Sequence, residues 1–500
     1  MGSRHSRRRV TAQQVRLLVG AARPLGALLI VLAVFMLGTA VVGRLFADSW
    51  AGVWAMVLSA LITAGSGLLL RWGSRREATE NFGRRQGLLV VALAWVALGT
   101  YGGLPFLLGA DFSLPDAIFE ATSGFTTTGA TILTEIELRL SQPLHLWRLL
   151  THWLGGLGLV VLFVAIFPAL GVGGKHMYHS EVPGPRSQGL VPRIRDTSKA
   201  LWRIYLVITL AEVLLLMLAG MDPFNSIAHS FSTMGTGGFS TLNSSIAGFH
   251  NVPAEMIIVA FMVIAGMNFG LIFEASHKRS WRLLLRNTEL RVYLAFYALV
   301  VVVVALNIWP LKESLLQAFR FASFQVAAVI STTGFGTDDF EVYPALSRLM
   351  LILCYFVGGS AGSTAGGMKV IRIIIIVKVL LIELRRVHRP KLVAPVMVDG
   401  RPYPASALSE VFAFITVYLL TFLVGAVLVA ALDPVDLTTA FMASLACVAN
   451  VGPGLGLVGP IDNYGFFSPA AKLVLSCLML LGRLEFFTLL ALLNPRFWKR

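Results

Sequence analysis

The stretch FEATSGFTTTGAT, Phe119–Thr131, decides how this sequence is interpreted. It contains three consecutive threonines, with Gly124 and Gly129 on either side of them. The stretch falls between two long apolar runs, 87–108 and 146–170. A helix that only crosses a bilayer does not require such a segment, so its chemistry needs a separate explanation.

The composition indicates a membrane protein. Of the 500 residues, 56% are hydrophobic and 13% are charged, against about 25% charged in soluble domains. Apolar runs of about 20 residues, enough for one crossing, recur along the chain. The net charge of +15 comes from basic residues clustered in short links, which argues against a nucleic-acid-binding face. The three cysteines have no paired spacing, so neither a disulfide framework nor a zinc site is indicated.

Ten apolar spans are predicted from these runs. They are 24–46, 52–70, 87–108, 146–170, 203–220, 253–274, 292–310, 345–384, 408–432 and 470–493. The first is too long for the core of a signal peptide, so we expect it to be retained. In this layout 33 of the 41 Lys and Arg residues fall on one side. The positive-inside rule therefore predicts that the N-terminus and the C-terminus are cytoplasmic.

The last eight spans form four pairs, and each pair encloses a segment rich in small and polar residues. The segments are SGFTTTGAT (123–131), STMGTGGFS (232–240), ISTTGFGTD (330–338) and ANVGPGLGL (449–457). Aligned on their glycines, they recur about every 100 residues, which indicates an internal repeat. The aligned glycines are Gly129, Gly237, Gly334 and Gly452. Each unit crosses twice, so all four have one orientation and can surround a common axis.

The sequence thus predicts an all-α polytopic membrane protein. It has four pseudo-symmetric helix–pore loop–helix repeats around one pore, plus two leading transmembrane helices. The expected divisions are 1–85 for the leading pair and 86–175, 176–280, 281–390 and 391–500 for the repeats. In repeat three we expect the second helix to be broken.

The loop composition suits the binding of a dehydrated cation. Non-helical backbone at membrane depth is tolerated where it lines a watery cavity or is buried in protein. Four such strands can direct carbonyl oxygens inward and replace the hydration shell of a cation. Glycine allows the backbone angles this requires, and threonine adds hydroxyls and stiffness. A short preceding helix, such as 115–125, would point its negative end at the axis. The alternative is four polar re-entrant turns without an ion.

These loops resemble the selectivity filters of the Trk/Ktr/HKT superfamily of potassium transporters. DAIFEATSGFTTTGAT, WLGGLGLVVL, STTGFGT, GGSAGSTAGGMKVIR and NVGPGLG are similar to TrkH-type membrane subunits, as are the two leading spans. The resemblance implies a potassium-binding filter at Thr127, Thr128, Gly129, Gly235, Thr236, Gly237, Thr332, Thr333, Gly334, Asn450, Val451 and Gly452.

The resemblance also implies an assembly. It would be a homodimer in a prokaryotic inner membrane, with one pore per subunit and a cytoplasmic regulatory ring of the TrkA type. Potassium would be the ion bound, and a nucleotide (NAD or ATP) would act only through the partner subunit. Met234-Gly235-Thr236 and Asn450-Val451 depart from the family pattern. The four glycines favour potassium, because in plant members a serine at the first of them accompanies sodium transport.

The segment GGSAGSTAGGMK, 358–369, interrupts the second span of repeat three. It has no Gly-Lys-Ser/Thr ending and no preceding strand, so it does not match a phosphate loop. It is either a kink that packs closely through small residues or a strand that obstructs the pore below the filter. The family has an intramembrane gating loop here. The candidate gate residues are Gly358, Gly359, Gly362, Ser363, Thr364, Gly366, Gly367 and Lys369.

Arg483 lies within the last apolar span, and a charge at membrane depth indicates a function by default. The family places this arginine below the filter as a barrier to cations. The alternative is an ion pair with a buried carboxylate such as Glu485 or Glu212. An excess of acidic residues on the outer side would concentrate cations, unless it is only a solvated surface. Asn268 could line the cavity or bond across helices, and His152 is expected to be a packed residue.

The function predicted is potassium-selective uptake gated by the loop and Arg483. A sodium-permeable or proton-coupled symporter on the same fold is the first alternative. A membrane-embedded enzyme is more remote, because no nucleophile, base or metal cluster has usable spacing. A scaffold without transport would leave the four filter-like loops unexplained.

Overall fold

The computed structural model describes residues 2–46, 50–74, 84–158 and 194–498. Six of its helices are long and apolar enough to cross a membrane, or eight if each of two bent pairs counts as one span. One two-residue antiparallel pair, β1 (Met397–Val398) and β2 (Arg401–Pro402), is the only sheet in the described residues. The predicted all-α polytopic class is confirmed.

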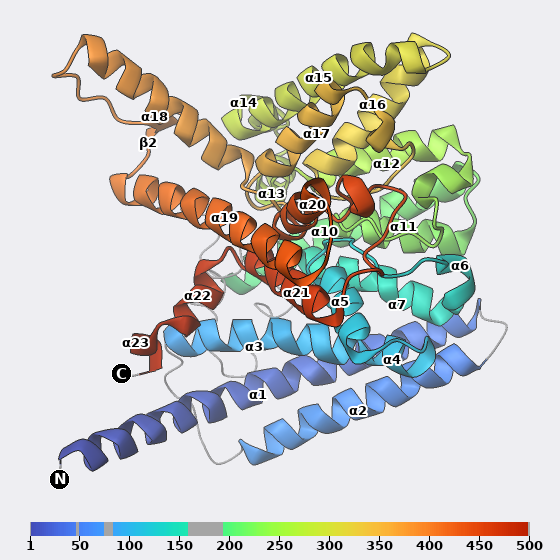
Figure 1. Ribbon diagram of the computed structural model, residues 1–500, viewed down its shortest axis with the longest axis vertical. Helices are drawn as coiled ribbons and strands as arrows, with labels where there is room; N and C mark the ends of the chain where they lie inside the picture. Colours follow the sequence, from blue (N-terminus) through green and yellow to red (C-terminus); the bar gives the residue numbers. More distant parts are fainter. Residues whose placement is uncertain (1, 47–49, 75–83, 159–193, 499–500) are drawn as a thin grey trace.

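The leading helices form a separate layer at one edge of the molecule. α1 (Gly2–Arg44) and α2 (Ala51–Gly73) lie side by side, and α3 (Arg84–Gly102) lies next to α1 (Figure 1). Both termini lie on the same side of the structure, together with β2 and the far end of α18 (Val370–His388). The remaining helices pack around a buried centre.

The four predicted repeats contain the following elements. Repeat one has α3, α4 (Leu104–Gly109), α5 (Leu114–Phe125), α6 (Ile136–Arg139), α7 (Gln142–Trp153) and the π-helical turn η1 (Leu154–Gly158). Repeat two has α10 (Ile194–Leu218), α11 (Pro223–Gly235), η3 (Ser245–Phe249), α12 (Val252–Ala265) and α13 (Phe269–His277), followed by α14 (Arg282–Arg286). Repeat three has α15 (Thr288–Ile308), η4 (Trp309–Leu311), α16 (Leu315–Ile330), η5 (Phe340–Val342), α17 (Ala345–Val357) and α18. Repeat four has α19 (Ala405–Leu432), α20 (Leu437–Ala449), η6 (Gly456–Val458), α21 (Pro469–Arg483), α22 (Phe487–Leu493) and α23 (Pro495–Trp498).

Four short helices, α5, α11, α16 and α20, hold the loops singled out in the sequence. Each begins with a side-chain cap: Ser113, Asp222, Ser314 and Asp436 accept a hydrogen bond from the backbone N–H three residues later. Such caps satisfy one of the free N–H groups at a helix start. The four helices therefore begin and, as described below, end in the same way.

The second helices of the repeats are interrupted. α17 ends at Val357 and α18 begins at Val370. α12 and α13 meet at 90°, and α21 and α22 meet at 116°. The sequence predicted continuous spans at 253–274 and 470–493, and this was wrong. Asn268 starts a new helix by capping the N–H of Leu271.

The bend between α21 and α22 falls at two residues, neither of which is glycine. Glu485 and Phe486 have φ of 51° and 60°, which reverse the chain between α21 and α22. In repeat one, η1 follows α7 directly, and residues 159–170 of the predicted span lie outside the described residues. Interruptions thus occur in repeats two, three and four at the same place, after the helix that packs against the short helix, and a π-helical turn takes this place in repeat one.

Replacement of Asp222 tests whether the side-chain cap stabilises the start of α11. Asp222 Oδ1 accepts from Asn225 N at 3.0 Å. We expect Asp222→Ala to lower the thermal midpoint of the purified protein in detergent, because loss of a cap costs about 1 kcal/mol. Asp222→Ser keeps an acceptor and should retain most of the stability. Equal losses in the two variants would show that the cap is not the stabilising feature.

Candidate functional site

Each of the four short helices ends in the same backbone reversal. Thr127 N donates to Gly124 O at 3.0 Å, and Thr128 N donates to Ser123 O at 2.9 Å. This pair of bonds defines a Schellman motif, in which a residue just past the helix end is left-handed. The motif recurs in the other three loops. The left-handed residues are Thr127, Thr236, Thr332 and Asn450, with φ of 56°, 55°, 57° and 55°.

A glycine with positive φ follows two residues after each reversal. These glycines are Gly129, Gly238, Gly334 and Gly452, with φ of 80°, 80°, 78° and 94°. In repeat two the sequence predicts Gly237 as the equivalent glycine, and the structure shows that it is Gly238, one residue later. The equivalent triplet is Thr236, Gly237 and Gly238, in place of Gly235, Thr236 and Gly237. Gly235 is instead the last residue of α11.

The four loops pack against one another in a closed cycle. A Cβ added at each of the four glycines would overlap a carbonyl oxygen of the next loop. Gly129 faces Gly237 O, Gly238 faces Thr333 O, Gly334 faces Val451 O and Gly452 faces Thr128 O. The loops therefore form a ring in chain order that returns to its beginning. We call these four segments, 127–129, 236–238, 332–334 and 450–452, the filter strands.

The side chains of the left-handed residues connect the ring to its surroundings. Thr127 Oγ1 accepts from Arg483 at 3.2 Å, and Thr332 Oγ1 accepts from Gly366 N at 2.7 Å. Asn450 Nδ2 donates to Thr128 Oγ1 at 2.9 Å, which links the fourth strand to the first. Arg483 and the 358–369 loop, both singled out in the sequence, thus contact the start of the filter strands.

The loop 358–369 is extended and irregular. Gly358, Gly362, Gly367 and Lys369 have φ between 67° and 75°. A lysine with positive φ is uncommon, since only glycine adopts this region without strain. Lys369 donates to Ala365 O, which closes the loop on itself.

Backbone bonds fasten this loop to repeats two and four. Ser360 N donates to Gly266 O at 2.8 Å, and Gly367 N donates to Ala449 O at 3.0 Å. Phe269 N donates to Gly362 O at 3.1 Å. The loop therefore uses the break in repeat two and the end of α20 as its partners. Gly359, Ser363, Thr364 and Gly366 lie within this fastened segment.

Glu289 holds the loop from the α15 side. Its Oε1 accepts from Ala361 N at 2.7 Å and from Ile371 N at 3.3 Å. One carboxylate oxygen therefore binds both the loop and the first turn of α18. Glu289 gives no signal in the sequence, because an acidic residue in the first turn of a helix is common.

Arg483 lies at the end of α21, between the loop and the π-turn of repeat one. It donates to Thr364 O at 2.8 Å and to Gly155 O and Gly156 O at 2.6 and 2.8 Å. Glu485 instead pairs with Arg372 at 2.7 Å, and the buried Glu212 is not among the acceptors of Arg483. These contacts do not support the alternative pairing with Glu485 or Glu212.

The ring of His152 explains why the second strand has Gly237 where the other three strands have a larger residue. This ring stacks on Phe239 with centroids 4.2 Å apart, and its Nδ1 lies 3.0 Å from Ser232 Oγ. A Cβ at Gly237 would overlap this ring. The other strands have Thr128, Thr333 or Val451 at that position. His152 is therefore packed behind the second strand, as the sequence led us to expect.

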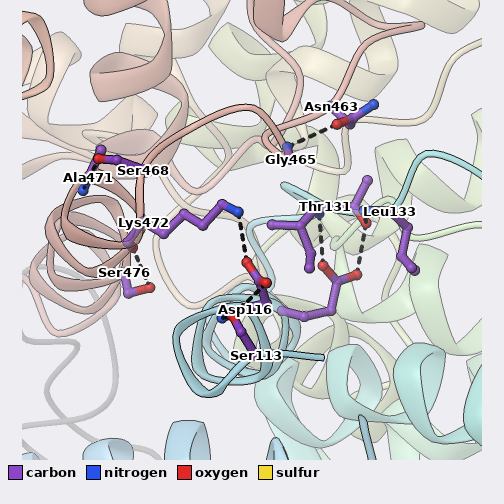
Figure 2. A network of polar contacts seen from close by, with 12 residues as sticks. Ser113, Asp116, Thr131, Leu133, Asn463, Gly465, Ser468, Ala471, Lys472 and Ser476 are labelled. Atoms are coloured by element: carbon purple, nitrogen blue, oxygen red, sulfur yellow. Dashed lines mark hydrogen bonds and ion pairs between the residues drawn. The ribbon is translucent and has the colours of Figure 1, made fainter. Parts of the chain in front are cut away.

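A polar network lies at the N-terminal end of the first short helix. Lys472 of α21 reaches Asp116 of α5 at 2.7 Å (Figure 2). Burial raises the pKa of the Asp116 carboxyl, but hydrogen bonds from Lys472 and Ser113 outweigh it and hold the pKa below its ordinary value. The pair joins repeat one to repeat four behind the ring. Figure 2 also shows Thr131, just beyond the first strand, beside this network.

No group of three or more His, Cys, Asp or Glu side chains suited to a metal ion occurs in the described part of the chain. The oxygens brought together in the ring are instead backbone carbonyls and threonine hydroxyls. Neutral oxygens of this kind can replace the hydration shell of an alkali-metal ion. The structure is therefore that of a polytopic helical membrane protein with a ring of four re-entrant strands, the architecture of a cation-transport protein.

Comparison with known proteins identifies the family. The TrkH family, described as "Cation transport protein", matches residues 56–499, and the chain belongs to it. The Trk system potassium uptake protein TrkH of Halomonas elongata is 40% identical over 483 residues, covering 96% of this chain and 98% of the relative. TrkH of Escherichia coli K12 is 38% identical over 482 residues, covering 95% and 98%.

A solved structure gives the same result. The crystal structure of the potassium transporter TrkH from Vibrio parahaemolyticus aligns with a TM-score of 0.85 and 37% identity. The alignment covers 96% of this chain and 99% of that one. The resemblance expected from the loop motifs is confirmed.

The ring contacts predict the effect of a side chain at Gly129. A serine there would have to adopt φ near 80° and would overlap Gly237 O. We expect Gly129→Ser to lower the ratio of rubidium to sodium uptake in proteoliposomes, because the neighbouring strand must shift. Gly65→Ser in α2 is the control, since nothing lies within 4 Å of its Cβ position. An unchanged uptake ratio in Gly129→Ser would show that this strand does not discriminate between the ions.

Proposed function

We propose that this protein carries potassium into a prokaryotic cell across the inner membrane, through a pore that passes along the axis of the four filter strands. The closed ring of glycine–carbonyl contacts is the observation that carries the proposal. The relatives named as potassium uptake proteins support the same ion. The four repeats, with the divisions given above, are proposed as the units around this pore.

The ring offers a physical basis for ion recognition. Carbonyl oxygens that replace a hydration shell make the cost of dehydration depend on their number, geometry and field strength. The C-terminal ends of α5, α11, α16 and α20 converge on the ring, since each leads directly into a strand. A helix C-terminus carries about half a negative elementary charge, which favours a cation. Positive φ at the four glycines turns the strands in the same sense.

The loop 358–369 and Arg483 are proposed as the gate. Both touch the inner ends of filter strands, through Thr332 and Thr127. The loop is hydrogen-bonded to repeats two and four, and motion of these repeats relative to repeat three would release it. Arg483 adds a positive charge at the same level, which opposes a passing cation.

Other parts of the proposal concern assembly and orientation. Both termini lie on one side of the structure, which agrees with a cytoplasmic position for each. A homodimer and a cytoplasmic TrkA-like ring that binds NAD or ATP are proposed on the family resemblance. The printed name "Trk system" of the relatives supports a system of several components.

A sodium-permeable or proton-coupled symporter is the main rival function. The presence of all four glycines argues for potassium, with Gly238 in the position first given to Gly237. A membrane-embedded enzyme is not favoured, because the relatives are transport proteins. Ion-substitution flux in proteoliposomes separates the two transport functions.

Growth of a potassium-uptake-deficient bacterium tests the proposal directly. Expression of this chain, with its regulatory partner where needed, is expected to restore growth at low external potassium. Sodium in place of potassium should not restore it. Failure to take up potassium or rubidium in cells and in proteoliposomes, with the protein folded and inserted, would overturn the proposed function.

Shortening the loop tests its role as an obstruction. Deletion of part of 362–367 should raise basal rubidium flux, because it removes backbone from below the ring and leaves the filter strands intact. Flux has to be divided by the amount of folded protein. A fall in flux with normal folding would mean that the segment is structural.

Replacement of Arg483 separates its charge from its hydrogen bonds. Two unit charges about 6 Å apart repel by about 3 kcal/mol at an effective dielectric constant of about 20. Even about 1.4 kcal/mol changes a rate tenfold. Arg483→Ala should therefore raise potassium flux per folded molecule, and Arg483→Lys should raise it less. Equal increases would assign the effect to the lost hydrogen bonds to Thr364, Gly155 and Gly156 and not to the charge.

A further inference from the structure

In three of the four short helices, the side chain at one equivalent position forms a hydrogen bond to the chain that leaves the same filter strand. This position lies seven residues before the left-handed residue, and it is occupied by Glu120, His229 and Gln325. Glu120 accepts from Thr131 Oγ1 at 2.9 Å and from Ile132 N at 3.0 Å. His229 Nε2 lies 2.9 Å from Ser240 Oγ. All three side chains are fully buried.

Gln325 makes the corresponding bond in repeat three. Its Nε2 donates to Asp338 O at 2.9 Å. Repeat four has Ala443 at this position, which cannot form such a bond. There Tyr464 takes over: its hydroxyl donates to Gly452 O at 2.7 Å, and its N–H donates to Thr131 O at 2.7 Å. Every filter strand, or the chain just beyond it, is thus bonded from behind by a buried side chain.

Among the four equivalent positions, only that of repeat one holds a carboxylate. Arg148 of α7 donates from Nε to Glu120 at 2.6 Å and from its NH1 nitrogen to Ser240 O at 2.8 Å. Its guanidinium lies 3.6 Å from the centroid of the Phe239 ring. Ser240 leaves the second strand, whereas Thr131 leaves the first. The pair of Glu120 and Arg148 therefore fastens two neighbouring strands to each other.

A buried ion pair is a costly way to fill space. Removing two charges from water costs several kcal/mol per ion, and an apolar pair of similar volume is often as stable. Packing alone therefore does not account for the pair. Its directional bonds fix the positions of two strand exits, which apolar contacts would leave free to slide.

We propose that Glu120 and Arg148 are positioning residues that set ion selectivity by holding the first and second filter strands at a fixed separation. His229 and Gln325 each hold the exit of their own strand, and Tyr464 bonds the fourth strand and the exit of the first. The inference rests on the proposed function, because it assigns the pair to the discrimination of that same ring. The pair lies outside the ring and contacts no passing ion, so its effect is transmitted through the backbone at 131–132 and 240.

Two variants test the pair. Glu120→Gln has nearly the same shape, but it removes the charge that faces Arg148. The double variant Glu120→Gln with Arg148→Met removes both charges and leaves neither one buried alone. We expect the ratio of rubidium to sodium uptake in proteoliposomes to fall about tenfold in both, equivalent to about 1.4 kcal/mol. The thermal midpoint should fall in the single variant and recover in the double variant.

The control is another Glu–Arg ion pair that involves one of the short helices. Arg320 of α16 binds Glu255 of α12 through two bonds of 2.7 and 2.6 Å, and neither residue contacts a filter strand exit. Glu255→Gln should lower stability and leave the uptake ratio unchanged.

The outcomes are distinct. A ratio that recovers together with stability in the double variant, or that is unchanged in all variants, would overturn the positioning role alone. Absence of rubidium uptake by the unmodified protein would overturn the proposed function and this inference with it.

Discussion

A peptide group in the middle of a bilayer has no water to bond to, and the centre of this protein is built around that constraint. The four short helices end at membrane depth, so their last carbonyls and the strands beyond them need partners. Schellman bonds satisfy the first strand residues, and side chains such as Thr332 satisfy backbone N–H groups of the loop below. The last carbonyl of α20, Ala449 O, accepts from Gly367 N in the interrupted helix of repeat three, and Gly266 O at the break in repeat two accepts from Ser360 N of the same segment.

Much of the fold could be predicted from sequence because its repeated parts have the same local chemistry. Hydropathy gave the class and the order of the spans, and small-residue segments such as 123–131 marked the four loops. The register of repeat two was wrong for a physical reason. The sequence GTGG offers three glycines, whereas the backbone reversal is made by Thr236, a residue type that gives no signal for positive φ.

Other features depend on tertiary contacts that hydropathy does not record. The bend falls at Glu485 and Phe486, which are neither glycine nor proline, so the apolar run 470–493 reads as one helix. Glu120 and Arg148 are 28 residues apart in sequence and meet only because α5 packs against α7. A buried arginine in the 146–170 run was nevertheless a usable signal, since a charge at that depth requires a partner.

The contact between His152 and Gly237 shows what a single chain can do that a ring of identical subunits cannot. In a symmetric tetramer, a bulky ring behind one strand would stand behind all four, and every strand would need the same glycine. Here the bulk of one repeat is matched by a loss of side chain in the next, and the other three strands keep Thr128, Thr333 and Val451. Fusion of the repeats therefore frees each boundary between strands to change independently. The backbone of the ring is close to fourfold symmetric, while the side chains differ at each boundary between neighbouring strands.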